Sequence, residues 1–356
     1  MEIKATPLTD PFDDVAQTAP AKRRVAGPVG RIAWAAALLL GLGVTVWLVR
    51  SIGLGDIAES ARQMGIGGFL LVCIASIGLF ALLGAAWQSA AGEPLRRVPL
   101  FSLARLVREA ASDFLPFSQI GGMAAGARVI RTGGIPAPRI YASMMADQAT
   151  EMASQILFSL AGVAAATALL TADPAHAALR RSIIGGVVML GILLMALLFG
   201  QGRFLTFVSG LAGRVLPGLS AIVSETSAEL TRLYRAPHRI ALSFLWNLLA
   251  WLAMAAVAWL ILQLIGHPLP FWRMVAIESA IAVVRSAAFL VPGGLGLQEA
   301  AYAVVGPLFG LPPGPALALS LVKRARDGAL ALVGLISWQL VEISTLRRRK
   351  TLAPSA

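Results

Sequence analysis

Long apolar runs separated by shorter polar stretches recur along most of the chain. A helix needs roughly 20 apolar residues to cross the hydrocarbon core of a bilayer, which is about 30 Å thick. Runs of about this length occupy residues 32–49, 67–90, 142–170, 182–200, 240–266 and 316–341. The pattern therefore predicts an all-α, polytopic membrane protein with about six full spans.

Two further segments are apolar but broken by proline and glycine. The residues expected to break them are Pro116, Gly121 and Gly122 in the first segment, and Pro292, Gly293, Gly294 and Gly296 in the second. Broken helix is tolerated at membrane depth only where it is buried in protein or lines a wet cavity. We therefore expect two re-entrant hairpins that lie inside the protein and return to the side from which they started.

The two broken segments belong to a self-similarity with an offset of 176 residues. At this offset Pro116 matches Pro292, Gly134 matches Gly310, Pro136 matches Pro312 and Glu151 matches Asp327. One unmatched apolar run, 182–200, separates the two units, so the second unit would enter the membrane with opposite polarity. Inverted repeats of this kind are typical of secondary transporters. Chance matching is the alternative, because the chain contains 35 glycines and 20 prolines.

Composition and charge agree with a lipid environment. The chain is 57% hydrophobic and 13% charged, with a mean hydropathy of +0.76, whereas soluble domains carry about 25% charged residues. A net charge of +12 would suit nucleic acid, but the basic residues lie between apolar runs and not on one solvated face. Placing the N-terminal tail in the cytoplasm puts 19 Lys and Arg residues inside and five outside, which predicts that both termini are cytoplasmic.

These patterns predict how the chain is divided. We expect a disordered cytoplasmic tail at 1–30, a transmembrane domain at 31–346 and a basic cytoplasmic tail at 347–356. Within the domain, repeat A covers 67–170, repeat B covers 240–346, and 171–239 holds the linker span and a cytoplasmic amphipathic segment. The arginines of that segment would either face anionic lipid headgroups or belong to a plain cytoplasmic helix.

Polar side chains within or beside the apolar runs are candidates for a substrate cavity, because a charge at mid-helix costs at least ~2.5 kcal/mol. In the first unit they are Arg108, Glu109, Asp113, Gln119, Arg128, Asp147 and Glu151, and in the second Glu278, Arg285, Gln298, Glu299, Lys323, Arg324 and Asp327. At the 176-residue offset Asp147 matches Lys323 and Glu109 matches Arg285, with opposite signs. We therefore expect pairing across a pseudo-two-fold axis, around a polar cavity that admits a headgroup. The alternative is that these residues form structural ion pairs without substrate contact.

Two strings resemble the signatures of one membrane family. Residues 289–311, FLVPGGLGLQEAAYAVVGPLFGL, resemble the P-G-G-x-G-x-x-E signature of the transmembrane family named after lysylphosphatidylglycerol synthase, also called flippase-like. Residues 114–135, FLPFSQIGGMAAGARVIRTGGI, resemble the family's other signature, although the acidic residue usual after its glycine is absent. The strings MADQATEMASQ, IESAIAVVRSAAFLVPGGLGLQEAAY and ALSLVKRARD resemble the HpnL-type branch associated with hopanoid biosynthesis.

The resemblance implies movement or handling of a lipid across the bacterial inner membrane, with membrane lipids as substrate and hopanoid-biosynthesis proteins as partners. In the family founders a soluble aminoacyl-transferase domain follows the membrane part and carries out lysyl transfer. Only ten residues follow residue 346 in this sequence, so we do not expect lysyl transfer. We expect no cofactor or metal, because His176, His238 and His267 lack metal-ligand spacing. Lipid translocation is the leading hypothesis. The alternative is a membrane-embedded accessory protein, enzyme or scaffold of hopanoid biosynthesis that transports nothing.

Overall fold

The computed structural model describes residues 54–114, 118–170, 185, 217–287 and 296–352. All regular secondary structure in these ranges is helical, which confirms the predicted all-α class. The expected first span at 32–49, the linker span at 182–200 except for residue 185, and the N-terminal tail lie outside the described residues. The breaks at Pro116, Pro292, Gly293 and Gly294 lie outside them as well.

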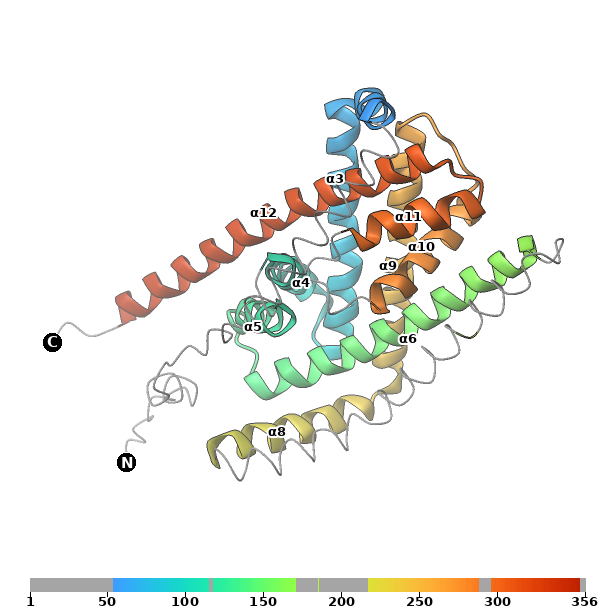
Figure 1. Cartoon of the computed structure of the whole chain (residues 1–356). Coiled ribbons are helices and arrows are strands. Elements are labelled where there is room, and N and C mark those ends of the chain that lie inside the picture. Colours follow the sequence, from blue (N-terminus) through green and yellow to red (C-terminus); the bar gives the residue numbers. More distant parts are fainter. Residues whose placement is uncertain (1–53, 115–117, 171–184, 186–216, 288–295, 353–356) are drawn as a thin grey trace, which may run out of the picture.

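Four long helices form the frame of the molecule (Figure 1). They are α3 (Leu54–Ala91), α6 (Ala137–Leu170), α9 (Pro237–Leu264) and α12 (Pro313–Leu352). Within α3 the backbone kinks at Gly65, whose positive φ of 61° suits glycine. Two stretches among the described helices, Arg62–Ala91 and Pro237–Leu264, are long and apolar enough to cross a membrane. These stretches match the apolar runs expected at 67–90 and 240–266.

Shorter helices fill the space between the long ones. They are α4 (Val98–Phe114) with the 3₁₀ turn Leu95–Arg97 before it, α5 (Ser118–Arg131), α8 (Pro217–Tyr234), α10 (Phe271–Ala287) and α11 (Leu297–Leu308). The pairs α4/α5 and α10/α11 each pack together, and each pair flanks one of the expected hairpin breaks. In α8, Leu230 and Leu233 pack on α6, while Arg232 points outward, so the amphipathic segment uses its apolar face for packing against the bundle.

The order of elements repeats along the chain as long, short, short, long. Helices α6 and α12 begin at Ala137 and Pro313, which are 176 residues apart, and α4 and α10 each have 17 residues. The turns before α6 and α12 hold Gly134 and Gly310 with φ of 74° and 82°, a backbone region that favours glycine. The predicted spacing of these punctuating residues therefore coincides with the helix starts.

The corresponding long helices run in opposite directions. Gly92, after the end of α3, lies beside Arg239 at the start of α9, and Gly266, after the end of α9, lies beside Gln63 near the start of α3. Helices α3 and α9 are therefore antiparallel neighbours. Figure 1 shows the same reversal for α6 and α12, which cross the molecule in opposite senses.

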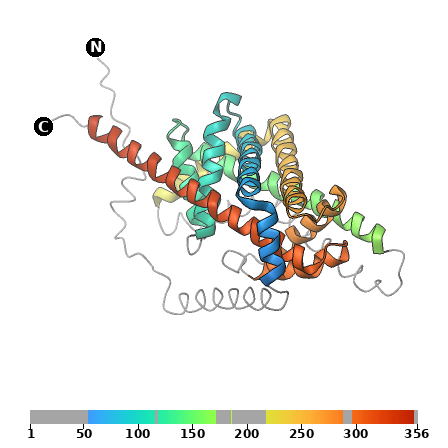
Figure 2. The same cartoon turned by 90° about the horizontal axis from the view of Figure 1, so that it is seen from above.

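The two units interlock through close contacts at glycine. Helix α6 of the first unit packs on α10 of the second, where Gly162 meets Ser279. Helix α12 of the second unit packs on α4 of the first, where a Cβ at Gly334 would lie 2.7 Å from Ala110 Cβ. Small residues let helix backbones approach closely in membrane proteins. Seen from above, α12 also extends beyond the other described helices (Figure 2).

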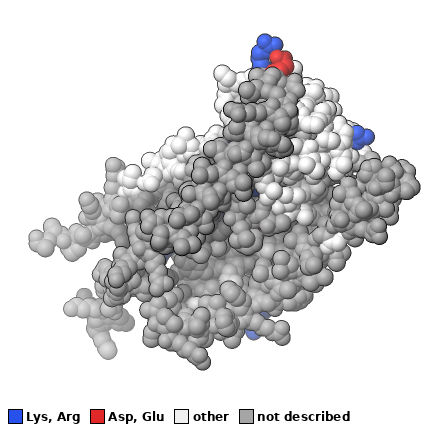
Figure 3. All heavy atoms as spheres, viewed as in Figure 1, with Lys and Arg blue, Asp and Glu red and all other residues white. Residues whose placement is uncertain are grey.

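Apolar side chains divide between the interior and the outer faces of the helices. Inside, Trp87 meets Phe101 edge-on at 5.7 Å between ring centroids. Outside, α3 exposes Ile66 and Ile74, and α12 exposes Ile336. Charged side chains of the described residues are sparse on the face shown in Figure 3 and lie mainly at its margins. Exposed apolar faces of this extent are expected of helices solvated by lipid.

Candidate functional site

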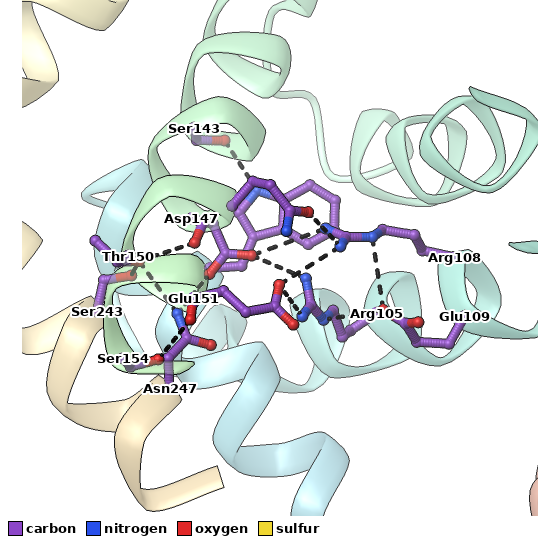
Figure 4. A network of polar contacts seen from close by, with 12 residues as sticks. Arg105, Arg108, Glu109, Ser143, Asp147, Thr150, Glu151, Ser154, Ser243 and Asn247 are labelled. Carbon is purple, nitrogen blue, oxygen red and sulfur yellow. Dashed lines mark hydrogen bonds and ion pairs between the residues drawn. The ribbon is translucent and has the colours of Figure 1, made fainter. Parts of the chain in front are cut away.

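A cluster of charged side chains is buried between α4 and α6, and Figure 4 shows its contacts. We call it the α4–α6 cluster, and its members are Arg105, Arg108, Glu109, Asp147 and Glu151. The guanidinium of Arg105 lies 3.1 Å from Asp147 Oδ2 and 2.5 Å from Glu151 Oε2. Arg105 Nε and Arg108 Nε lie 3.5 and 3.6 Å from the same oxygen of Glu109. Two arginines therefore share three carboxylates.

Helical spacing places these side chains. Residues three and four apart share a helix face, so Arg105, Arg108 and Glu109 project together from α4. Asp147 and Glu151 project together from α6 in the same way, as the sequence predicted. Both α4 and α6 lie within 67–170, the range predicted for repeat A.

Amide and hydroxyl side chains hold the cluster from α6 and α9. Asn247 on α9 donates to Asp147 Oδ1 at 3.3 Å and to Thr150 at 3.1 Å. Thr150 also shares a hydrogen bond of 2.8 Å with Ser243 of α9. Arg108 donates to Gln148 at 2.7 Å. Asn247 and Ser243 are absent from the predicted candidates, although two polar residues inside the apolar run 240–266 were a usable signal.

Exposure varies sharply across the α4–α6 cluster. The side chains of Arg105 and Asp147 are 1% and 0% exposed, whereas those of Glu109 and Glu151 are 40% and 20% exposed. Arg105 Nε and Arg108 Nη1 are buried and have no hydrogen-bond partner of good geometry. The cluster thus has a sealed inner part, which includes the two guanidinium groups with unmatched N–H donors, and an outer part formed by two partly exposed carboxylates.

A second buried network joins α10, α11 and α12. We call it the Glu278 triad, and its members are Glu278, Tyr302 and Lys323. The Lys323 ammonium donates to Glu278 Oε1 at 2.7 Å, to Glu278 Oε2 at 2.6 Å and to Tyr302 Oη at 2.6 Å. Tyr302 in turn donates to Glu278 Oε1. All three side chains are buried, so this network is closed to solvent.

Other predicted residues of the second unit lie around the triad. Buried Glu299 at the start of α11 accepts from Arg324 at 2.6 Å, and the other oxygen of Glu299 has no hydrogen-bond partner. Gln298 donates to Ser320 at 3.2 Å. These contacts join α11 to α12 beside the triad. On α12 itself, Arg326 pairs with its neighbour Asp327 at 2.5 Å.

The expected pairing between the two units is wrong. Asp147 pairs with Arg105, and Lys323 pairs with Glu278, so each charge has its partner in its own repeat. The predicted match of Glu109 with Arg285 does not form either, because Glu109 lies beside Arg105 and Arg108. The physical reason is that the arginines of α4 project toward α6, where they pair with Asp147 and Glu151.

None of the remaining predicted residues is a member of the α4–α6 cluster or of the Glu278 triad. Arg128 is exposed on α5 and Arg285 is exposed on α10. Asp113 and Gln119 are in α4 and α5, but their side chains are outside the described part of the structure. Gly121 is half-buried, Gly122 is buried against Ser112, and Gly296 begins α11 with a positive φ of 78°. Among the described residues, no group of three or more His, Cys, Asp or Glu side chains is placed to hold a metal ion.

Charged networks sealed among helices whose outer faces are apolar define an integral membrane protein with a polar interior. The family model described as "Lysylphosphatidylglycerol synthase TM region" matches residues 34–334, so the chain belongs to this transmembrane family. The family associates the chain with membrane lipids. No curated protein and no solved structure matches the chain.

Proposed function

We propose that this protein translocates a polar lipid across the bacterial inner membrane, with the headgroup passing the α4–α6 cluster. The observation that carries the proposal is the pair of buried arginines with unused N–H groups beside two partly exposed carboxylates. Guanidinium groups bind phosphate and carboxylate through parallel hydrogen bonds. Such a pair suits an acidic headgroup oxygen, while Glu109 and Glu151 suit hydroxyl or amine groups.

The energetic need for such a cluster follows from the cost of a bare headgroup in hydrocarbon. Burying a polar group without hydrogen bonds costs roughly 2–7 kcal/mol, and an unpaired charge costs more. Fixed charges that replace water along the path lower this barrier. The apolar outer faces of α3 and α12 leave the lipid tails in contact with the bilayer while the headgroup moves inside.

Alternating access through an inverted repeat is the mechanism we propose. The antiparallel direction of α3 and α9, the opposite senses of α6 and α12 and the matched helix starts at Ala137 and Pro313 support it. In this mechanism the α4/α5 and α10/α11 pairs are re-entrant hairpins that reach the middle of the bilayer from opposite sides. Broken helices near the midplane form the substrate sites of many secondary transporters.

The orientation we propose has six full spans and both termini in the cytoplasm. Arg62, assigned to the outside, lies on α3 near the Gly266 turn, and Arg273, also assigned to the outside, follows that turn at the start of α10. At the opposite end of α3, Arg139 donates to the Ala91 carbonyl at 3.1 Å, and Arg239 lies beside Gly92. These four arginines lie at opposite ends of α3 according to the side assigned to each, which supports the proposed orientation.

For the substrate we propose a hopanoid or another polar lipid, because three strings in the chain resemble the HpnL-type branch. The competing functions are those of a membrane-embedded enzyme or a scaffold. We expect no enzymatic change of the lipid. All three functions make different predictions for one reconstitution experiment.

The test uses liposomes that contain the purified protein and a lipid with a fluorescent headgroup. Loss of fluorescence after an impermeant quencher is added measures movement between leaflets, and mass spectrometry of the recovered lipid measures chemical change. We expect faster movement of unaltered lipid, and competition by unlabelled hopanoid would identify the substrate class. Altered lipid would indicate an enzyme. Neither movement nor alteration would favour a scaffold.

A matched pair of variants separates the role of the α4–α6 cluster from general effects of charge removal. Glu109→Gln removes a partly exposed carboxylate that contacts Arg105 and Arg108. Glu229→Gln removes a carboxylate paired with Arg232 on α8, outside the cluster. We expect Glu109→Gln to slow lipid movement and Glu229→Gln to leave the rate unchanged. Equal rates for both variants would contradict a headgroup path along the cluster.

A further inference from the structure

The hydrogen bonds of the Glu278 triad leave no free donor on its lysine. An ammonium group has three N–H donors and no acceptor. In the structure all three are used, by the two oxygens of Glu278 and the hydroxyl of Tyr302. A headgroup would therefore have to break the triad to bind there. This closure distinguishes the triad from the α4–α6 cluster, where two arginines retain unused donors.

Stability alone does not account for a buried ion pair of this kind. Replacing such a pair with apolar side chains of similar volume is often neutral or stabilising. Buried ionisable residues in membrane helices commonly mark proton or ion pathways. Of the ionisable groups in the triad, Lys323 is the one that can lose a proton to become neutral while Glu278 stays charged.

Two further arginines lie near the triad. Arg285 on α10 and Arg326 on α12 lie close enough to act electrostatically on both Lys323 and Tyr302. Asp327 is paired with Arg326, so one positive charge remains in excess around the pair of Glu278 and Lys323. Of the other helices packed on α12, α11 carries Glu299, which pairs with Arg324, and α4 carries Arg105, Arg108 and Glu109 of the α4–α6 cluster. In their described parts, α3 adds Cys73 near Arg326, α6 adds the uncharged Gln155, and α9 has its ionisable residues His238 and Arg239 in the first turn.

Arg326 is the second buried cation of α12 beside the triad. It follows Lys323 by three residues on α12, so both side chains project from one face of the helix. Arg326 is buried, and its Nη1 has no hydrogen-bond partner. An arginine cannot lose its proton in proteins. Exchange of Lys323 for Arg326 as the partner of Glu278 would give two discrete arrangements of the kind that coupling requires.

We propose that Lys323 is the proton carrier of a proton-coupled lipid transporter. In one arrangement the protonated lysine is bound to Glu278 and Tyr302. Release of one proton from Nζ to water on one side leaves a neutral amine, and Glu278 then pairs with Arg326. Uptake of one proton from the other side restores the triad. This inference rests on the proposed lipid transport and adds its energy source.

The test imposes a pH gradient on the same liposomes and measures two quantities. A fluorescent pH indicator inside the liposomes reports proton movement, and the quencher assay reports the distribution of the labelled lipid between leaflets. One pH unit corresponds to about 1.4 kcal/mol, so the lipid ratio between leaflets can change by at most about tenfold for each proton exchanged. For the wild-type protein we expect a several-fold change and an accompanying proton flux.

Lys323→Arg is the decisive variant, because it keeps the positive charge but cannot release a proton. A purely structural ion pair would be preserved by this substitution, and the gradient effect would survive. We expect the gradient effect and the proton flux to be lost. Lys350→Arg makes the same substitution near the end of α12 and is expected to keep both. Circular dichroism of each variant in detergent establishes that it is folded.

The outcomes separate the two proposals. Proton coupling is wrong if the pH gradient changes neither the rate of lipid movement by the wild-type protein nor the lipid ratio between leaflets, and no proton flux accompanies the movement. Lipid transport stands in that case. If no lipid moves under any gradient, the proposed transport itself is wrong. If Lys323→Arg fails to fold, the wild-type protein still tests proton coupling. A coupled transporter must move protons when a lipid gradient is imposed, and the absence of this proton flux would contradict the proposal.

Discussion

Arg105→Met tests whether the α4–α6 cluster is a charged network sealed inside the fold. The methionine side chain has a similar length and no charge. Its introduction would remove the ion pairs of Arg105 with Asp147 at 3.1 Å and with Glu151 at 2.5 Å. Asp147, which is fully buried, would keep Asn247 at 3.3 Å, and the nearest remaining cation would be Arg108 at 4.0 Å.

The expected loss of stability follows from the charge that remains. Breaking a buried ion pair by removing one partner costs about 3–5 kcal/mol, because the other charge is left uncompensated. This range corresponds to a change of about two to four orders of magnitude in the unfolding equilibrium constant. The double variant Arg105→Met, Asp147→Asn removes both charges. We expect it to recover a large part of the loss, since close charged partners couple strongly.

The assay is equilibrium unfolding of the purified protein in mixed micelles by increasing fractions of SDS, followed by circular dichroism. Arg232→Met serves as the control, because this residue is 77% exposed on α8 and pairs with Glu229 of the same helix. Surface substitutions of this kind usually change stability by within about 0.5 kcal/mol. A loss below about 1 kcal/mol for Arg105→Met, or a double variant less stable than the single one, would refute the reasoning.

Two further pairs of substitutions test the packing of the fold. Gly126→Val places a side chain between α5 and α4, where an added Cβ would lie 3.1 Å from the Ala104 carbonyl oxygen. We expect the free energy of unfolding to fall by about 1–3 kcal/mol. A melting temperature equal to that of the exposed control Ala124→Val would contradict the close approach. Gly310→Ala forces alanine to a φ of 82° before α12 and should cost about 1 kcal/mol. In contrast, an alanine Cβ at Gly328 within α12 meets no neighbour within 4 Å, so Gly328→Ala should leave stability unchanged or raise it. If Gly310→Ala is more stable than Gly328→Ala in the SDS assay, the turn at Gly310 is misassigned.

The helical frame could be predicted from the sequence because it depends on local chemistry. Apolar runs of membrane-spanning length become α3 and α9, and the turn residues that repeat at 176 positions mark the starts of α6 and α12. Gly134 and Gly310 were visible as a matched pair because only glycine readily adopts the positive φ that these turns need. The polar face of Asp147 and Glu151 also followed directly from their spacing of four residues.

The partners of the buried charges could not be predicted in the same way. Spacing along a helix fixes which side chains share a face, but it does not fix which other helix packs there. Asp147 and Lys323 have opposite signs at matched positions, yet each one faces a helix of its own unit. Tyr302, a neutral member of the Glu278 triad, carries no charge pattern and becomes recognisable only when the helices are packed.

Photo-crosslinking tests most directly whether a lipid headgroup enters the interior of this protein. A lipid with a photoreactive headgroup is added to the reconstituted protein, and mass spectrometry maps the labelled residues. We expect adducts on α4 and α6 around Glu109 and Glu151, the partly exposed members of the α4–α6 cluster. Adducts confined to the outer apolar faces, around Ile74 and Ile336, would contradict passage of the headgroup through the fold.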